Sequence, residues 1–174
     1  TTTGATVLSG LDELPKGLLL WRGVLQWLGG IGIIVVAMVF LPELKVGGMQ
    51  IFKSEGFDTF GKILPRAGQI ASQISVIYLW LTITCMLSYL ALGMNALDAT
   101  VHALTTVSTG GFANYDASCA AFAGPKEYVA TLYMILAALP FVRYVQLING
   151  NTMALHKDTQ IRGFLATIAV LVLV

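Results

Sequence analysis

Charged residues are scarce in this sequence. Only 11% of its 174 residues are charged, 56% are hydrophobic and the mean hydropathy is +0.79, whereas a soluble domain carries about 25% charged residues. The net charge of +1 and the lack of any Lys/Arg cluster exclude the basic surface that a nucleic-acid-binding protein needs. The composition therefore predicts an integral membrane protein with no nucleic-acid partner.

Cysteine is nearly absent as well. Cys85 lies in an apolar run and Cys119 in a polar loop, and two such residues support neither a disulfide framework nor a metal-ligand spacing. No Gly-x-Ser-Gly or zinc-type spacing accompanies Ser108 or His102, as a catalytic site at either residue would require. We expect both cysteines to be packing residues, and we expect neither an enzyme activity nor a cofactor.

A recognisable leader is also missing, because no basic segment with a cleavage site opens the chain. The apolar run 164–174 at the other end is shorter than the roughly 20 residues of a membrane span. We therefore expect the sequence to be an interior piece of a longer polytopic protein.

Three longer apolar runs are present, and they predict membrane-spanning helices over 24–41, about 70–92 and about 128–148, the last kinked at Pro140. The predicted fold class is an all-α membrane protein made of repeated helix, pore helix, filter loop and helix units. Its expected parts are a filter strand and inner helix of a first repeat (1–42), a cytoplasmic loop (43–66), a complete second repeat (67–150), and a cytoplasmic loop with the start of a third repeat (151–174).

Between the second and third spans lies a helix too short to cross a bilayer. Asn95 can cap it and Asp98 falls at its third position, so the helix is predicted over about 96–106. The chain must then enter the membrane partway, turn at Ser108–Gly111 and leave again. We interpret Asp98 as part of the cap rather than an ion ligand, and His102 as a hydrogen-bonded packing residue rather than a proton relay or metal ligand.

The turn after this helix is the candidate site. Non-helical backbone at membrane depth must be buried in protein or line a watery cavity, and its carbonyl oxygens can replace the hydration shell of a cation, as in the loops of potassium channels. The C-terminal end of the preceding helix carries a partial negative charge that favours cations. The turn is therefore predicted to be an ion filter.

The first residues of the chain repeat the same motif. Thr1–Thr6 reads Thr-Thr-Thr-Gly-Ala-Thr, and Gly4 stands 106 residues before Gly110. Internal repeats usually place the functional site at the interface between the copies. We expect the two loops to lie at one shared pore.

Four stretches resemble the Trk/Ktr/HKT superfamily of potassium transporters, in particular its bacterial Trk-type uptake subunits: Thr1–Leu8, Leu18–Pro42, Gly47–Gln50 and Leu97–Phe112. The resemblance implies a potassium-channel-like architecture in which four repeats surround one pore, each with a single-glycine filter strand. By position, it implies that the backbone carbonyls of two strands bind potassium: Thr2, Thr3, Gly4 and Ala5 in the first, and Ser108, Thr109, Gly110 and Gly111 in the second. It also implies a homodimer that binds a cytoplasmic ring of nucleotide-binding regulatory subunits.

Lysine and arginine are unevenly distributed. Seven are expected on one side of the membrane, Lys45, Lys53, Lys62, Arg66, Arg143, Lys157 and Arg162, and three on the other, Lys16, Arg22 and Lys126. The positive-inside rule makes the first side cytoplasmic, so the filter loops are expected to face the outside of the cell inner membrane. We interpret Arg143 as snorkelling to lipid headgroups, with a functional charge at the inner mouth of the pore as the alternative.

The leading functional prediction is the pore-forming subunit of a potassium uptake system. An alternative is a secondary transporter of a small substrate that binds its coupling ion at the half-helix end near residue 106. That transporter would need ionisable groups inside the spans, and 24–41 and 70–92 contain none. A purely structural membrane anchor is a further alternative.

Overall fold

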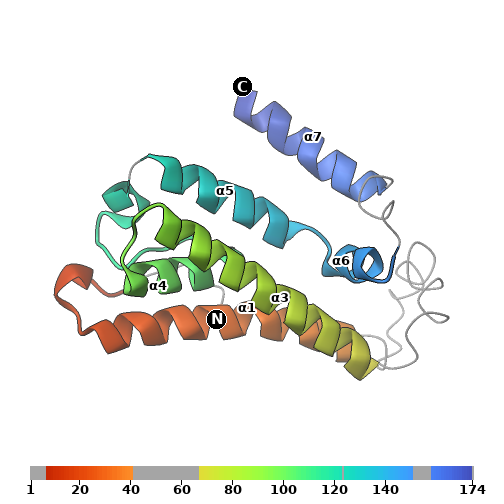
Figure 1. The fold of residues 1–174 in the computed structure, drawn as a ribbon, viewed down its shortest axis with the longest axis horizontal. Coiled ribbons are helices and arrows are strands. Elements are labelled where there is room, and N and C mark those ends of the chain that lie inside the picture. The colour runs from red at the N-terminus through yellow and green to blue at the C-terminus, as the bar shows by residue number, and fades with distance from the viewer. Residues whose placement is uncertain (1–6, 41–66, 123, 151–157, 174) are drawn as a thin grey trace.

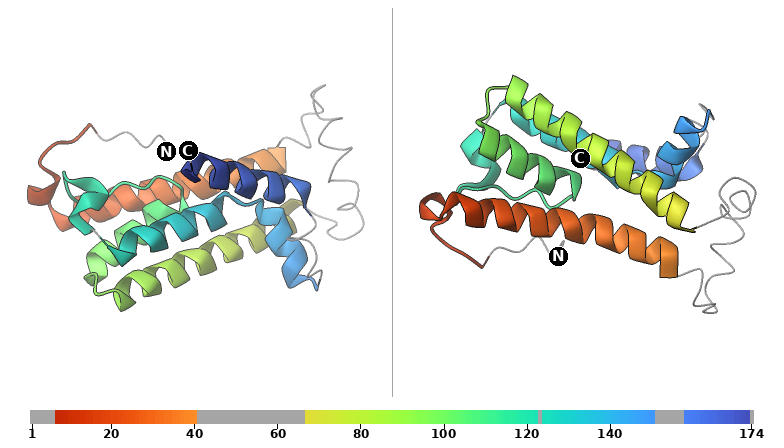
Figure 2. Two further views of the ribbon diagram at one scale, coloured as in Figure 1. Left: turned by 90° about the horizontal axis from the view of Figure 1, so that it is seen from above. Right: turned by 60° about the horizontal axis from the view of Figure 1, so that its bottom comes forward.

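The computed structural model describes residues 7–40, 67–122, 124–150 and 158–173, and every regular element in these ranges is a helix. The longest are α1 (Lys16–Phe40) and α3 (Ala67–Ala91), of 25 residues each. At about 1.5 Å per residue, each is near 37 Å long and can cross a hydrocarbon core of about 30 Å. Figures 1 and 2 show α1 and α3 on either side of the short helix α4 (Ala96–Val107).

Polar contacts join the two long helices where they approach each other. Trp27 Nε1 of α1 donates to Thr82 Oγ1 of α3 at 2.9 Å. The Tyr78 hydroxyl of α3 returns a bond to the Trp27 carbonyl at 3.2 Å. Lipid tails are as apolar as the helix surfaces, so no hydrophobic force drives membrane helices together. Interhelical hydrogen bonds and close backbone contacts hold them together instead.

The short helix α4 lies inside the bundle, in contact with α1, α3 and α5 (Pro125–Ala138). Eight of its twelve residues are buried, and its length of about 18 Å cannot cross a bilayer. The helix therefore ends inside the protein, so the backbone groups at its end need partners other than water.

The predicted inner helix over about 128–148 requires a correction, because it is two helices. α5 ends at Ala138 and α6 (Phe141–Ile148) begins after Pro140, with an angle of 83° between them. Pro140 has no N–H to continue the helix, and it holds Leu139 in an extended conformation, with ψ of 149°. A break rather than a kink results.

The break leaves the Leu136 carbonyl without its usual helical partner, because the residue four positions later is Pro140, which has no N–H. The Tyr144 hydroxyl of α6 donates to the Leu136 carbonyl at 2.8 Å, and the Leu139 N–H reaches the same oxygen at 3.3 Å. A carbonyl that α5 cannot satisfy is thus satisfied by α6, as buried backbone at membrane depth requires.

By length and hydropathy, α3 qualifies as a membrane span over Ala71–Ala91, with a mean hydropathy of 1.8. The α5–α6 pair passes the same test only if the two bent helices are counted as one span. The remaining elements of the described ranges are the single turns η1 (Leu11–Glu13) and η4 (Ser118–Phe122) and the helix α7 (Thr159–Leu173). The core packs α3 and α4 together with α6, and Cys85 lies buried in it.

Candidate functional site

The predicted filter strand Ser108–Gly111 follows directly on the C-terminal end of α4. The other predicted strand, Thr2, Thr3, Gly4 and Ala5, lies outside the described residues. The geometry of the site is therefore given by α4, by the strand after it and by the helices that back this strand.

The N-terminal end of α4 is capped as its sequence predicts. The Asn95 side chain accepts a bond from the Asp98 N–H at 2.9 Å. The Asp98 carboxylate, 2% exposed, then accepts bonds from Asn114 Nδ2 at 2.8 Å and from the Tyr115 hydroxyl at 2.7 Å. The hydrogen bond from the Tyr115 hydroxyl to Asp98, together with burial, raises the pKa of Tyr115, so the hydroxyl stays protonated and donates at neutral pH. Asp98 thus fixes the segment by which the chain leaves the filter.

The C-terminal end of α4 closes in a Schellman motif. The Gly110 N–H donates to the Thr105 carbonyl at 2.8 Å and the Thr109 N–H to the Thr106 carbonyl at 2.9 Å. Thr109 takes the left-handed position of the motif, with φ of 57°. The usual occupant of that position is glycine, because a β-branched residue is strained there.

Thr105 holds the strand in place through hydrogen bonds to three backbone groups of residues 110–112. Its side chain is fully buried, and its carbonyl also accepts the Gly111 N–H at 3.1 Å. Its hydroxyl donates to the Phe112 carbonyl at 3.0 Å. Nothing in the sequence motif distinguishes Thr105 from its neighbour Thr106, so its role emerges only from the fold.

Two carbonyls of the strand take no part in the hydrogen bonds just described. Within the described residues, no hydrogen bond reaches the carbonyl oxygen of Thr109 or that of Gly110. Both follow the C-terminal end of α4, where the helix dipole favours positive charge. Oxygen atoms without hydrogen bonds next to the negative end of a helix are suited to a dehydrated monovalent cation.

Two helices, α1 and α5, back the strand. A Cβ on Gly30 of α1 would lie 3.0 Å from the Ser108 Cβ, so this glycine makes room for the strand. A Cβ on Gly110 would lie 2.5 Å from Gln26 Nε2, also of α1, and one on Gly111 would lie 2.6 Å from the Cε of Met134 in α5. The strand therefore has no space for side chains on the side that faces these helices.

His102, one of the alternative site residues, packs inside the bundle. Its ring makes edge contacts with Phe122 at 4.8 Å and Tyr89 at 6.0 Å between centroids, and its Nε2 accepts or donates no hydrogen bond among the described residues. It borders a cavity of about 240 Å³ between α3, α4 and α5. The packing role fits the prediction of a hydrogen-bonded packing residue, but no hydrogen bond reaches Nε2 from the described residues.

The part of the chain that the structure describes holds no cluster of three or more His, Cys, Asp or Glu residues suited to a metal ion.

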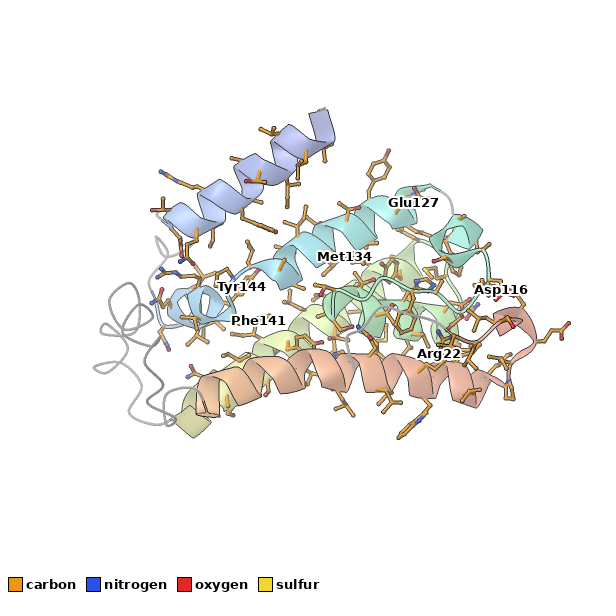
Figure 3. All side chains as sticks on the ribbon, turned by 180° about the vertical axis from the view of Figure 1, so that it is seen from behind. Arg22, Asp116, Glu127, Met134, Phe141 and Tyr144 are labelled. Atoms are coloured by element: carbon orange, nitrogen blue, oxygen red, sulfur yellow. The ribbon has the colours of Figure 1, made fainter. Side chains whose placement is uncertain are left out.

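Two contacts tie the segment after the filter to the segment around the start of α1. The Asp116 carboxylate accepts bonds from the Gly10 and Leu11 N–H groups, both at 3.0 Å. The Arg22 guanidinium lies over the Phe112 ring, 5.1 Å from its centroid. Figure 3 shows Arg22 and Asp116 at the same end of the bundle. Gly10 and Asp116 are 106 residues apart, which is also the spacing of the two predicted filter glycines, so the bond joins equivalent positions of the two predicted repeats.

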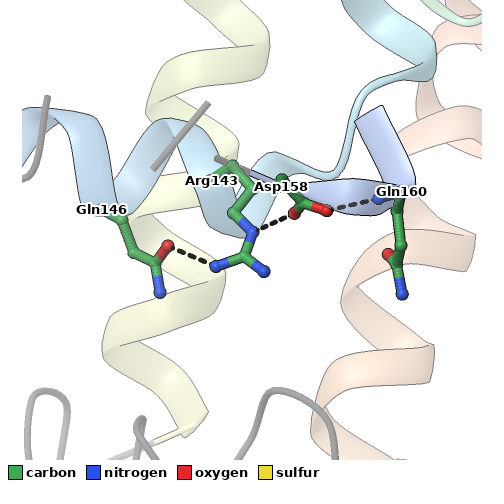
Figure 4. Close-up of polar contacts among 4 residues, drawn as sticks. All are labelled: Arg143, Gln146, Asp158 and Gln160. Carbon is green, nitrogen blue, oxygen red and sulfur yellow. Dashed lines mark hydrogen bonds and ion pairs between the residues drawn. The ribbon is translucent and has the colours of Figure 1, made fainter. Parts of the chain in front are cut away.

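Arg143 forms an ion pair that the sequence analysis did not predict. Its Nε donates to Asp158 Oδ2, and its Nη1 donates to Gln146 Oε1 at 2.8 Å (Figure 4). The Gln160 N–H donates to Asp158 Oδ1 at 2.7 Å. Burial raises the pKa of Asp158, but these hydrogen bonds and the Arg143 charge outweigh it and lower the pKa overall. Arg143 therefore joins α6 to the start of α7 rather than reaching only for lipid headgroups.

Comparisons with known proteins place this geometry among potassium transporters. The family model for TrkH, described as a cation transport protein, matches residues 1–174. The chain is 46% identical over 175 residues to the Trk system potassium uptake protein TrkI of Halomonas elongata, covering 99% of this chain and 36% of that protein. It is 37% identical over 178 residues to the Trk system potassium uptake protein TrkH of Escherichia coli K12, covering 100% and 37%.

A solved structure gives the same result. The crystal structure of the potassium transporter TrkH from Vibrio parahaemolyticus matches with a TM-score of 0.78 and 35% identity, covering 94% of this chain and 33% of that one. The chain thus spans about a third of the length of each of these relatives.

Proposed function

Because this chain belongs to the TrkH family of cation transport proteins, we propose that it forms part of the potassium-conducting pore of a membrane uptake system. The observation that carries the proposal is the strand Ser108–Gly111, held by Thr105 at the end of a buried half-length helix, with the Thr109 and Gly110 carbonyls bonded to none of the described residues. The relatives named as potassium uptake proteins support potassium as the transported ion.

In the proposed mechanism the protein replaces water around the ion. The ion enters from outside, and backbone carbonyls of the predicted filter residues Ser108, Thr109, Gly110 and Gly111 take the place of hydration waters. The negative end of α4 lowers the energy of a cation there. Thr2, Thr3, Gly4 and Ala5 would supply a second strand to the same ring, and two further strands would come from outside this sequence.

Placement and partners follow from the sequence pattern and the resemblance. The distribution of Lys and Arg supports an inner-membrane protein whose filter faces outward. The resemblance to Trk-type subunits leads us to propose a homodimer and a cytoplasmic nucleotide-binding regulatory ring.

The experiment that tests the proposal is Gly110→Ser in the full-length protein. The added side chain has no space behind the strand, where a Cβ already approaches Gln26 Nε2 to 2.5 Å. The carbonyls should shift and the discrimination of potassium from sodium should weaken. Uptake of both ions is measured in cells that lack other potassium uptake systems, at equal amounts of protein in the membrane. Gly4→Ser should have the same effect, and unchanged potassium-to-sodium ratios in both variants would contradict the filter assignment.

A further inference from the structure

The filter glycine at position 110 is required for a reason other than its own backbone conformation. Gly10, Gly93, Gly111, Gly124 and Gly150 have positive φ, but Gly110 does not. An alanine could therefore adopt the backbone of Gly110 without strain. What excludes a side chain at this position is the neighbour that occupies the space.

That neighbour is Gln26 of α1. A Cβ built on Gly110 would lie 2.5 Å from Gln26 Nε2, 2.9 Å from its Cδ and 3.1 Å from its Cγ. Three consecutive atoms of one side chain therefore occupy the space that a side chain at position 110 would need. Gln26 is 3% exposed, so its amide has little room to turn away.

The amide of Gln26 is also chemically unusual for its surroundings. Its Nε2 is buried and has no hydrogen-bond partner among the described residues. An unpaired buried amide donor is destabilising, so a glutamine is a poor choice if the position needs only an apolar filler. The strand against which it packs carries the free carbonyls of Thr109 and Gly110.

We propose that Gln26 is a positioning residue for the ion filter. Its side chain occupies the place of a Cβ at Gly110 and fixes the distance of the strand from α1, and its amide N–H is the donor available to the filter backbone. Gln26 does not touch the ion. This inference rests on the proposed function and names a selectivity determinant that lies outside the filter motif, on the helix that follows the other predicted strand.

The first test removes the amide and keeps the bulk. Gln26→Leu in the full-length protein should lower the potassium-to-sodium uptake ratio severalfold, because the branched leucine side chain fills the space behind Gly110 differently and presents no donor to the strand. Gln160→Leu is the matched control, because that side chain is exposed on α7, and it should leave the ratio unchanged. Protein in the membrane is quantified for each variant by immunoblot.

The second test uses the contact itself. Gly110→Ala should reduce selective potassium uptake because its methyl group collides with Gln26. Combining it with Gln26→Ala removes the collision, and the double variant should regain selective uptake relative to Gly110→Ala alone. Because relief of the collision would restore folding as well, the uptake ratios are compared at equal amounts of protein in the membrane, so that the suppression reports on the position of the strand.

The outcomes distinguish this inference from the function on which it rests. If the wild type does not take up potassium selectively, both are overturned. If the wild type is selective but Gln26→Leu matches it, and Gln26→Ala does not improve Gly110→Ala, the inference about Gln26 is overturned and the proposed pore stands.

Discussion

At Thr109 the filter strand contains a residue in a conformation that its side chain disfavours. The φ of 57° lies in the left-handed region, which costs an L-residue with a Cβ about 1–2 kcal/mol. The residue is held there by the Schellman bonds of Thr109 and Gly110 to the end of α4 and by its own hydroxyl, which donates to the Ser108 carbonyl at 2.8 Å. Strain of this kind concentrates at functional sites, where the surrounding structure imposes it.

The prediction at this scale is that Thr109→Gly stabilises the fold. Glycine adopts the left-handed region without penalty, so the midpoint of thermal unfolding in detergent should rise by an amount that corresponds to about 1 kcal/mol. Thr109→Ala is the control, since it also loses the hydroxyl but keeps the Cβ and the strain. Equal unfolding midpoints for the glycine and alanine variants would show that position 109 is not strained.

Among the elements, the α5–α6 pair shows how a membrane helix can be interrupted without leaving its backbone unsatisfied. Pro140 removes the continuing N–H, and Tyr144 supplies a hydroxyl to the Leu136 carbonyl at 2.8 Å. Figure 3 shows Tyr144 and Phe141 together on α6, beside the end of α5 that carries Met134. The break brings Phe141 and Val145 into the core with Tyr78, so α6 packs against α3.

We therefore expect Tyr144→Phe to destabilise the protein by about 1 kcal/mol, because the Leu136 carbonyl loses the hydrogen bond from the Tyr144 hydroxyl. The unfolding midpoint in detergent measures this effect. Tyr128→Phe on α5 is the matched control, since Tyr128 is 79% exposed and should give no change. A Tyr144→Phe variant as stable as the Tyr128→Phe variant would mean that the hydroxyl does not support the break.

For the whole molecule, two contacts join segments that belong to different predicted repeats. Asp116 bonds to Gly10 and Leu11 across a separation of about one repeat. Arg143, at the end of the second repeat, pairs with Asp158 at the start of the third. Both carboxylates lie next to the first turn of a helical element, where a negative charge is favoured. They hold successive repeats at fixed positions around the predicted pore axis.

The pair of Arg143 and Asp158 predicts a specific dependence on pH. A carboxylate whose pKa is lowered on folding stabilises the folded state above its unfolded pKa, and this contribution is lost as the pH falls through the folded value, here below 3.8. Asp158→Asn should therefore lower stability at pH 7 by about 1–3 kcal/mol, because Arg143 is left without its counter-charge. The difference from the wild type should shrink only when the pH falls below about 4.

Unfolding midpoints of both proteins across this pH range measure the effect. Glu13→Gln removes an exposed carboxylate and should follow the wild type throughout. A constant difference between wild type and Asp158→Asn at every pH would contradict the assignment of the stabilisation to the charged pair.

The sequence by itself determined the class of the protein, the helical elements and the place of the candidate site. Long uncharged runs are a local signal for membrane helices, and the length of 96–106 between Asn95 and Ser108 was enough to predict a helix that does not cross the membrane. The resemblance of Leu97–Phe112 to known filter motifs then supplied the ion, since hydropathy carries no information on potassium.

Only the tertiary structure decided what holds the filter strand. The roles of Thr105, Gln26 and Met134 depend on which faces of α1, α4 and α5 meet, and residues 26 and 110 are far apart in the chain. The same reason explains Arg143, whose partner Asp158 lies beyond a turn. At Pro140 the sequence predicted a kink, and the break became evident only with Tyr144 in place to satisfy the freed carbonyl. Local sequence patterns specify individual helices. Which side chains fill the space next to a glycine is decided only when the helices pack together.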